Sequence, residues 1–556
     1  MAGHFPSKKQ FNRQFHAILN PEAGFYKVVL VYSLAISLLT LAVPISLQLL
    51  IDTVANIALV RAVILIALLL FGLLTLSGIM FALRAYALEL FARKIYARIS
   101  SEIALTAMLA ESHFFEQNHK ADLFNRYFDI LTLKKNIPTI LTNGFTLILQ
   151  AIIGFTVVSF YHFYFLIFSI GLILILWLIW KIWGWRSINT SFRLSEAKYQ
   201  TAAWLQSLAV NNEAYWSSHN PAYALDKTNN LVDEHIQRQS DHFHNTYAQL
   251  IAMLFLYATA SAILLGLGGW LVLQGQLTLG QLVAAELIMS AIFVGLPQLA
   301  GYLDSYFDVC AAVEELARFQ HVETEDPEKN TDIAMPKDAV IAFNRVKIHR
   351  LNQEMEFNLE LPAGGLYKAS GNLLALRHFA ELLRRNYRPD SGLITIGGHD
   401  NSDIQRQQLR HTVRLINRVT LPPITIRDFM DMYVKSNGKY SRQQALALLE
   451  LDDEIGHMKD GLDTLLSRSA WPLSQPQAIR LKLASTLLSE PSILILEDIV
   501  DVVDHDIIDR FLSAMHDMGT TVVYFTRRRD ITKFEYLLNI DLENQSVHAV
   551  EEGLRS

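Results

Sequence analysis

The stretch LSQPQAIRLKLASTLLSEPSILILEDIVDVVD, residues 473–504, organises the second half of the chain. It opens with a short polar loop and continues with apolar residues at helical spacing from Ile479. Pro491 ends the predicted helix, because proline cannot continue a helix and biases the residue before it away from helical geometry. The compact apolar run Ile493–Leu496 follows, and it favours a buried strand of an α/β sheet.

Two carboxylates, Glu497 and Asp498, end this predicted strand at the edge where α/β proteins place ligands. Taken alone, the pair favours a solvated strand end over a magnesium and nucleotide site. The order of loop, helix, proline, strand, acidic pair and a further Asp504 resembles the ATP-binding cassette of ABC transporters, which has LSGGQ and a strand ending in Asp-Glu. The resemblance implies such a cassette here, with several chemical residues changed.

Composition indicates a membrane portion fused to a soluble one. Of the 556 residues, 51% are hydrophobic and only 18% are charged. The net charge of -6 gives no reason to expect a nucleic-acid partner. A single cysteine, Cys310, excludes an internal disulfide framework and fits a reducing cytosolic face.

Six membrane spans are predicted from long runs without charge, each sufficient to cross a bilayer as a helix. The runs are 28–51, 62–83, 136–180 divided by a turn at Tyr161-His162, and 242–285 divided by GQLTLGQ at 275–281, with the last span continuing to about Asp304. An even number of spans places both termini on one side. Basic residues gather in the connections 84–135 and 181–241, and Arg84 is counted among them. The turns at 161–162 and 275–281 have none, and the connection near 52–61 has only Arg61. The positive-inside rule therefore predicts a multi-pass inner- or plasma-membrane protein with both termini cytoplasmic.

The two cytoplasmic connections resemble the intracellular loops of ABC exporters, with a helical extension, a break and a helical return. That resemblance implies coupling helices near 114–128 and 209–223, and the turns look most like those of toxin- and protein-secretion exporters. The expected parts are a cytoplasmic segment 1–24, a six-helix membrane domain 25–321, an acidic linker 322–337 and a nucleotide-binding domain 338–556.

The phosphate loop of the cassette is expected at 370–377, counting back from YRPDSG at 387–392, which resembles the family's YRPTSG. An ATP-binding loop needs glycines for close backbone approach, a lysine for phosphate and a Ser or Thr for magnesium. This loop keeps Gly371 but differs at Ser370, Leu373 and Ala375 for glycine, Leu376 for lysine and Arg377 for serine or threonine. Side chains at the glycine positions obstruct the backbone approach, and leucine cannot neutralise phosphate.

Other positions implied by the resemblance are changed as well. Arg350 stands for the adenine-stacking aromatic, Arg418 for the magnesium-sensing glutamine and Arg527 for the switch histidine. The run 527–529 favours a solvated basic turn over a phosphate clamp. The acidic pair is reversed, and Asp498 is one methylene shorter than the family's catalytic glutamate, which shortens its reach as a general base.

The signature loop acts in trans across a dimer in this family, and here it reads LSQPQ. Ser474 and Gln477 are kept, but Pro476 lacks a backbone N–H that would face a partner's phosphate. The loop could hold a partner's ATP weakly against Ser474, or it could be kept only for packing. In the last span, Glu286 is predicted to face the interior as a translocation-path candidate, because a carboxylate in a span needs water or a partner. The alternative is an interfacial residue that extends outward.

The sequence thus predicts an α-helical six-span membrane domain of the type I ABC exporter kind, followed by an α/β P-loop-type ATP-binding cassette domain. The expected function is the non-catalytic half of a heteromeric exporter for a peptide, protein or other bulky substrate, paired with an active ABC half-transporter that hydrolyses ATP. No ATP, magnesium or other metal is expected on its own phosphate loop; both could bind only through the partner's site. The alternative is a homodimeric, ATP-independent scaffold or regulator of a secretion complex. The cargo and any periplasmic adaptor are left open.

Overall fold

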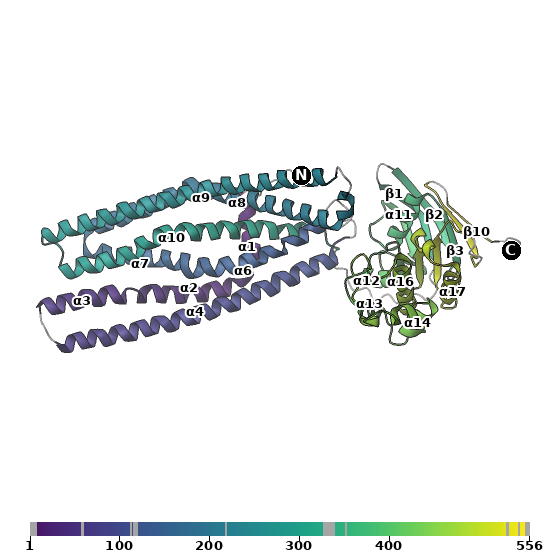
Figure 1. The fold of residues 1–556 in the computed structure, drawn as a ribbon, viewed down its shortest axis with the longest axis horizontal. Helices are drawn as coiled ribbons and strands as arrows, with labels where there is room; N and C mark the ends of the chain where they lie inside the picture. Colours follow the sequence, from purple (N-terminus) through teal and green to yellow (C-terminus); the bar gives the residue numbers. More distant parts are fainter. Residues whose placement is uncertain are drawn as a thin grey trace. The chain divides into compact units, whose positions relative to one another are not determined.

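The computed structural model describes residues 8–56, 60–111, 114, 120–216, 220–325, 340–350, 353–529, 533–542 and 545–550. The chain divides into two units, Met1–Glu325 and Asp326–Ser556 (Figure 1). This division falls inside the linker expected at 322–337, of which 326–337 lie outside the described residues. The first four linker residues belong to the first unit, because Thr324 forms a β-bridge with Ala110 and the amide of Glu325 donates to the carbonyl of Leu109 at 2.8 Å.

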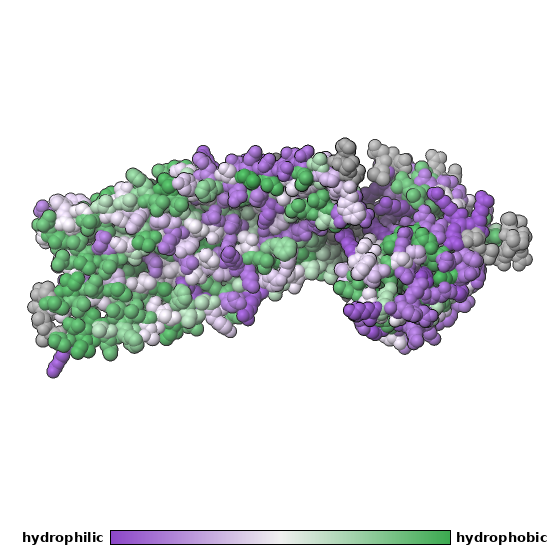
Figure 2. Space-filling model, in the orientation of Figure 1, coloured by the Kyte–Doolittle hydropathy of each residue, from purple (hydrophilic) through white to green (hydrophobic). Residues whose placement is uncertain are grey.

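The first unit is a bundle of long helices that run side by side (Figure 1). The helices are α1 (Lys8–Leu19), α2 (Ala23–Leu39), α3 (Ala42–Asn56), α4 (Val60–Leu109), α6 (Asp129–Thr139), α7 (Phe145–Tyr161), α8 (Phe163–Val210), α9 (Asn220–Leu273) and α10 (Leu279–Ala317). Six segments of the described chain are long and apolar enough to cross a membrane, which confirms the predicted number of spans. Apolar residues cover much of the surface of this unit (Figure 2).

The predicted turns between paired spans are confirmed, and local hydrogen bonds explain them. His162 is extended, with φ at -158°, and its Nδ1 accepts the amide hydrogen of Tyr164 at the start of α8. Thr278 and Gln281 form a capping box at the start of α10, which satisfies two amide donors of the first turn. Each helix therefore ends or begins where its backbone groups find side-chain partners.

The long connections 84–135 and 181–241, which were predicted to be cytoplasmic, break at the predicted places. Short 3-10 segments, η2 (Lys120–Phe128) and η4 (Asn212–Tyr215), interrupt the helices within 114–128 and 209–223. Residues 115–119 and 217–219 of those stretches lie outside the described residues. The coupling role of these breaks stays a prediction.

The segment 1–24 was predicted only as a polar cytoplasmic stretch, but it contains the amphipathic helix α1. Phe11 and Ile18 are buried in a core that also includes Phe192 and Cys310, itself fully buried. The helical spacing of Phe11, Phe15 and Ile18 is hidden among lysines and other polar residues, so composition alone does not reveal it.

The second unit is an α/β domain with two sheets. A six-stranded sheet has the order β10-β9-β3-β8-β7-β6, and a four-stranded antiparallel sheet has the order β2-β1-β4-β5. The strands are β1 (Ile341–Arg350), β2 (Gln353–Leu361), β3 (Leu366–Gly371), β4 (Ser391–Ile396), β5 (His399–Asp400), β6 (Val413–Ile416), β7 (Ile493–Leu496), β8 (Thr521–Phe525), β9 (Tyr536–Ile540) and β10 (Gln545–Ala549). The helices are α11 (Leu373–Leu383), α12 (Arg406–Thr412), α13 (Ile426–Asp431), α14 (Arg442–Leu448), α15 (Asp452–Gly456), α16 (Gln475–Ser489) and α17 (His505–His516).

The predicted strand Ile493–Leu496 is confirmed as β7, and all four residues are buried. It pairs in parallel with β6 and β8, so the carboxyl ends of these strands lie along one edge of the sheet. The preceding helix α16 ends before Glu490, which has a left-handed φ of 43°. The helix begins earlier than predicted, at Gln475, because Ser474 caps it. The expected polar loop is therefore mostly the first turn of α16.

The glycine kept in the expected phosphate loop has a packing reason. Gly371 has a φ of +128°, and a Cβ at this position would lie 2.1 Å from the carbonyl oxygen of Ile540 in β9. Only glycine can bring the end of β3 this close to the neighbouring strand.

We therefore expect Gly371→Ala to destabilise the second unit by about 2–3 kcal/mol, because the change adds both backbone strain and a steric clash. The measurement is thermal unfolding of the full chain. Gly456→Ala is the matched control, because a Cβ there meets no atom within 4 Å. Equal stability of the two variants would contradict this packing role.

Candidate functional site

A cavity of about 510 Å³ lies at the carboxyl edge of β3, β6, β7 and β8. It brings together most of the site positions predicted in the second unit. Its lining consists of Ala369, Ser370, Gly371, Leu373, Leu376, Arg377, Asn417, Arg418, Glu497, Asp498, Phe525, Thr526 and Arg527. The parallel strands explain this meeting, because residues that follow each strand share one edge of the sheet.

The N-terminus of α11 is closed by its own side chain. A single residue, Asn372, separates β3 from α11. Its Oδ1 accepts the amide hydrogens of Leu374 at 2.9 Å and Ala375 at 3.3 Å, and its own amide donates to the carbonyl of Ile540. These first-turn amides are the donors that a helix N-terminus otherwise offers to an anion. Leu376, at the lysine position, is 5% exposed.

The acidic end of β7 is neutralised from within the chain. Burial raises the pKa of Glu497, whereas a hydrogen bond with Asn417 and the positive charge of Arg377 oppose that rise. Arg377 therefore lies close enough to act on Glu497 electrostatically. A guanidinium thus stands at the position where the family resemblance places a hydroxyl that holds magnesium.

Arg350 does not line the cavity, although the resemblance placed it at the adenine position. Its guanidinium carbon lies 4.9 Å from the centre of the Tyr387 ring, a cation–π arrangement at the end of β1. Arg350 thus contacts the YRPDSG segment and not the group of residues at the carboxyl edge of the sheet.

Ser474 and Gln477 also lie outside the cavity lining and are hydrogen-bonded to each other. The Ser474 amide donates to Gln477 Oε1 at 2.7 Å, and Ser474 Oγ accepts the Gln477 amide hydrogen. Gln477 Nε2 donates to Glu454 Oε2 at 2.8 Å, and Arg480 binds the same carboxylate. Pro476 costs this helix no hydrogen bond, because first-turn amides have no partner within the helix.

Sequence reasoning missed a residue that joins two loops at this edge. Asp501 Oδ1 accepts hydrogen bonds from Tyr524 Oη and Thr526 Oγ1, both at 2.7 Å. Arg528 Nη1 donates to the carbonyls of Asp501 at 3.1 Å and Val503 at 2.6 Å. The basic run 527–529 is therefore not a uniformly solvated turn, because its middle residue is bound to the loop after β7. In the sequence, the basic run 527–529 was the feature that could have indicated these contacts.

Comparison with known proteins agrees with this architecture. Residues 28–205 match the family described as the ABC transporter transmembrane region. A solved bacterial Atm1-family ABC exporter with ATP bound aligns over 95% of this chain and 95% of its own, with a TM-score of 0.76 and 19% identity. The chain has the fold of an ABC exporter. The predicted six-span type I membrane domain followed by an α/β domain is thereby confirmed.

Curated relatives with this exporter architecture are similar over part of their length. A lactococcin-A transport/processing ATP-binding protein of Lactococcus lactis subsp. lactis is 26% identical over 50% of this chain and 40% of its own length. An alpha-hemolysin translocation ATP-binding protein of Escherichia coli is 25% identical over 50% of this chain and 40% of its own length. An ABC multidrug transporter of Aspergillus fumigatus is 23% identical over 83% of this chain and 60% of its own length. The chain spans about two fifths of the length of the first two relatives.

Glu286 is half-buried in α10 of the first unit. Its Oε1 accepts a hydrogen bond from Ser290 Oγ at 3.0 Å. Its Oε2 is enclosed and has no hydrogen-bond partner in the part of the chain that the structure describes. The enclosed oxygen supports an inward orientation over one that extends to lipid, and the translocation-path role stays a prediction.

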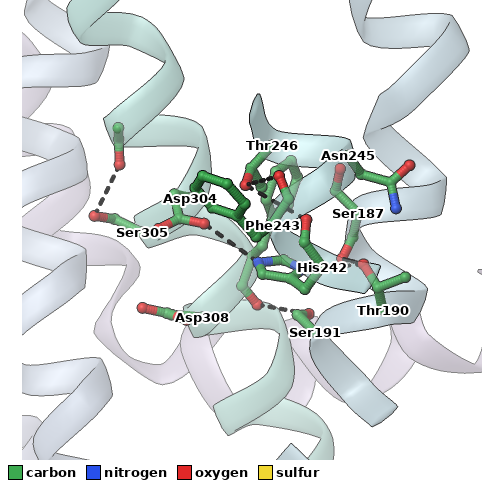
Figure 3. A network of polar contacts seen from close by, with 12 residues as sticks. Ser187, Thr190, Ser191, His242, Phe243, Asn245, Thr246, Asp304, Ser305 and Asp308 are labelled. Atoms are coloured by element: carbon green, nitrogen blue, oxygen red, sulfur yellow. Dashed lines mark hydrogen bonds and ion pairs between the residues drawn. The ribbon is translucent and has the colours of Figure 1, made fainter. Parts of the chain in front are cut away.

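A second polar group of this domain joins three helices around His242 (Figure 3). His242 of α9 contacts Thr190 Oγ1 of α8 through Nδ1 at 2.9 Å and Asp304 Oδ1 of α10 through Nε2 at 3.3 Å. One turn along α10, Asp308 Oδ2 accepts a hydrogen bond from Asn136 of α6. These contacts hold four helices together near one end of the predicted spans, the end predicted to be cytoplasmic.

The raised pKa of Glu497 has a measurable consequence. The folded domain binds this proton more tightly than the unfolded chain does, so its contribution to stability is greatest below the ordinary glutamate pKa and falls as pH rises through the raised value. We expect Glu497→Gln to raise Tm by roughly 2 °C at about pH 8 and to change it little at about pH 4. Thermal unfolding at both pH values, with the exposed Glu360→Gln as control, tests this expectation. A lower Tm at the higher pH would show that the Arg377 contact outweighs burial.

Proposed function

We propose that this chain is the non-catalytic half of a heteromeric ABC exporter. It would supply helices to the translocation path while an active partner half hydrolyses ATP. The observation that carries the proposal is the closed N-terminus of α11, where Asn372 takes the amide hydrogens that phosphate would need.

Magnesium–ATP does not fit the residues at this edge of the sheet in the family's manner. Leu376 brings no charge to phosphate, and the side chains of Leu373 and Ala375 stand where glycines would allow close approach. Arg377 already acts on Glu497 as a cation, so a magnesium ion beside this carboxylate would meet a like charge. No hydrolytic step is therefore assigned to this chain.

The relatives suggest the class of cargo. Two of them are named for lactococcin-A transport and processing and for alpha-hemolysin translocation. We extend this class to the chain as export of a peptide, a protein or another bulky substrate. Members of the ABC exporter family work as dimers in a lipid bilayer, and a heterodimer would provide the missing catalytic machinery. The signature residues Ser474 and Gln477 would then face the nucleotide of the active partner.

A second function is favoured by the hydrogen bonds of the signature loop. Both ends of the Gln477 carboxamide are engaged within the chain, by Ser474 and Glu454. A loop with its donors used in this way is poorly suited to a partner's phosphate, which supports a homodimeric, ATP-independent scaffold or regulator of a secretion complex. The subunit composition of the complex purified from its native host distinguishes the two functions.

The isolated full chain should neither bind nor hydrolyse ATP measurably at millimolar nucleotide. The double change Leu376→Lys, Arg377→Ser should not restore turnover, because Asn372, Leu373 and Ala375 still close the loop. The measurements are fluorescent-nucleotide titration and steady-state phosphate release, each with and without magnesium. Micromolar, magnesium-dependent binding by the unchanged chain would refute the proposal that its own site is inactive.

If an active half co-purifies, the reconstituted pair tests the role of each site. Ser474→Arg should lower the ATPase rate of the pair about tenfold or more, because it places bulk and charge against the partner's nucleotide. Asp498→Asn should change the rate less than twofold, because this carboxylate belongs to the inactive site. Equal large losses from both changes would make Asp498 catalytic, and no effect from either would favour the scaffold.

A further inference from the structure

Arg84 is a cation enclosed in the membrane domain. It lies in α4 and is 2% exposed. Its Nη1 donates to Ser33 Oγ of α2 at 3.1 Å and to Thr146 Oγ1 of α7 at 2.7 Å. The sequence placed Arg84 among the basic residues of a cytoplasmic connection, and the structure corrects this, because its guanidinium lies between three helices.

Other buried charges in this domain have partners of opposite charge. Glu22 pairs with Arg98 at 3.1 Å and with Lys94 at 3.3 Å. Buried Asp129 pairs with Lys198 at 3.0 Å. Arg84, in contrast, has no carboxylate within ion-pair distance among the residues that the structure describes, and its other close contact is the ring of its neighbour Phe81. A buried cation balanced only by hydroxyl groups is costly unless an anion joins it.

Two further observations favour an anion at this position. Nε and Nη2 of Arg84 donate to no described residue, and neither is among the fully enclosed, unpaired polar atoms of the described chain, so each keeps a small accessible surface. Ser37, one helical turn from Ser33 on α2, is 1% exposed, and its hydroxyl has no hydrogen-bond partner in the described ranges. Both Arg84 and a second serine on the helix that contacts it therefore keep unused hydrogen-bonding capacity among the described residues.

We propose that Arg84, oriented by Ser33 and Thr146, binds an oxyanion group in the interior of the membrane domain. The free Nε and Nη2 edge of a guanidinium matches two oxygens of a carboxylate or phosphate, and such paired hydrogen bonds are stronger than those between neutral groups. The two hydroxyls hold Nη1 and so fix the plane of the guanidinium. The oxyanion is either the carboxylate of a cargo or the phosphate of a lipid headgroup. The site needs only the membrane domain and does not depend on the inactivity of the second unit toward ATP.

The test uses the full chain in micelles of dodecyl maltoside, which carry no phosphate, and measures Tm. One arm adds phosphatidylglycerol stepwise, and the other adds a short apolar peptide with a free C-terminal carboxylate or with a C-terminal amide. We expect one arm to raise the Tm of the unchanged chain, which identifies the source of the oxyanion. Arg84→Gln should weaken the apparent affinity for that anion at least about tenfold, and Arg84→Lys should weaken it less, because lysine keeps charge without the paired donors.

Arg93→Gln is the matched control, because Arg93 lies on the same helix, is exposed, and pairs only with nearby Glu89 among the described residues. It should keep the response of the unchanged chain. If Arg84→Gln does not fold, Thr146→Val keeps the charge and should weaken binding severalfold by releasing Nη1. An equal anion response in Arg84→Gln and the unchanged chain would overturn the site. So would the absence of any response in the unchanged chain, which would leave Arg84 as a tie between helices.

Discussion

The oxygen of the Asn372 carboxamide accepts two amide hydrogens at the start of α11, and this contact uses two of the donors that a helix N-terminus otherwise offers to a ligand. Polar groups that leave water must find partners, and buried groups without them are rare. Here the partners come from the chain itself. At the edge of the sheet, Arg377 acts on Glu497. Outside that cavity, Gln477 binds Ser474 and Glu454 in the first turn of α16.

In the membrane domain, too, polar groups that leave water need partners, and other residues provide them there. The donors of its turns are satisfied by His162 and by the Thr278 capping box, and most of its described buried charges are paired. Arg84 and Glu286 differ, because each keeps hydrogen-bonding capacity that no described residue uses. They carry opposite charge and lie toward opposite ends of the predicted spans.

The sequence revealed the features that depend on pattern. Charge-free runs gave the six spans, and the apolar run Ile493–Leu496 gave the buried strand whose neighbours bring Arg418, Arg527 and the acidic pair to one edge. It did not reveal features that depend on three-dimensional partners. Nothing in the sequence shows that the Asn372 side chain accepts hydrogen bonds from the first turn of α11. Asp501 matches no motif, although its carboxylate joins the loop after β7 to the end of β8. The hydroxyls that contact buried Arg84 belong to residues 51 and 62 positions away in the sequence. From the sequence alone, a basic residue at the end of a span therefore could not be assigned to the interior of the bundle or to solvent.

The enclosed position of Cys310 has a practical consequence. This residue is the only cysteine in the sequence, and it is fully buried among side chains of α1 and of the C-terminal part of α10. Thiol reagents need an accessible thiolate, so the native chain should be nearly silent to maleimide labels while it stays folded. Cysteines introduced on the translocation path or at either end of the bundle can then be labelled in an otherwise unaltered background. Distance measurements by fluorescence or electron spin resonance could follow the motion of single helices without removing a native residue.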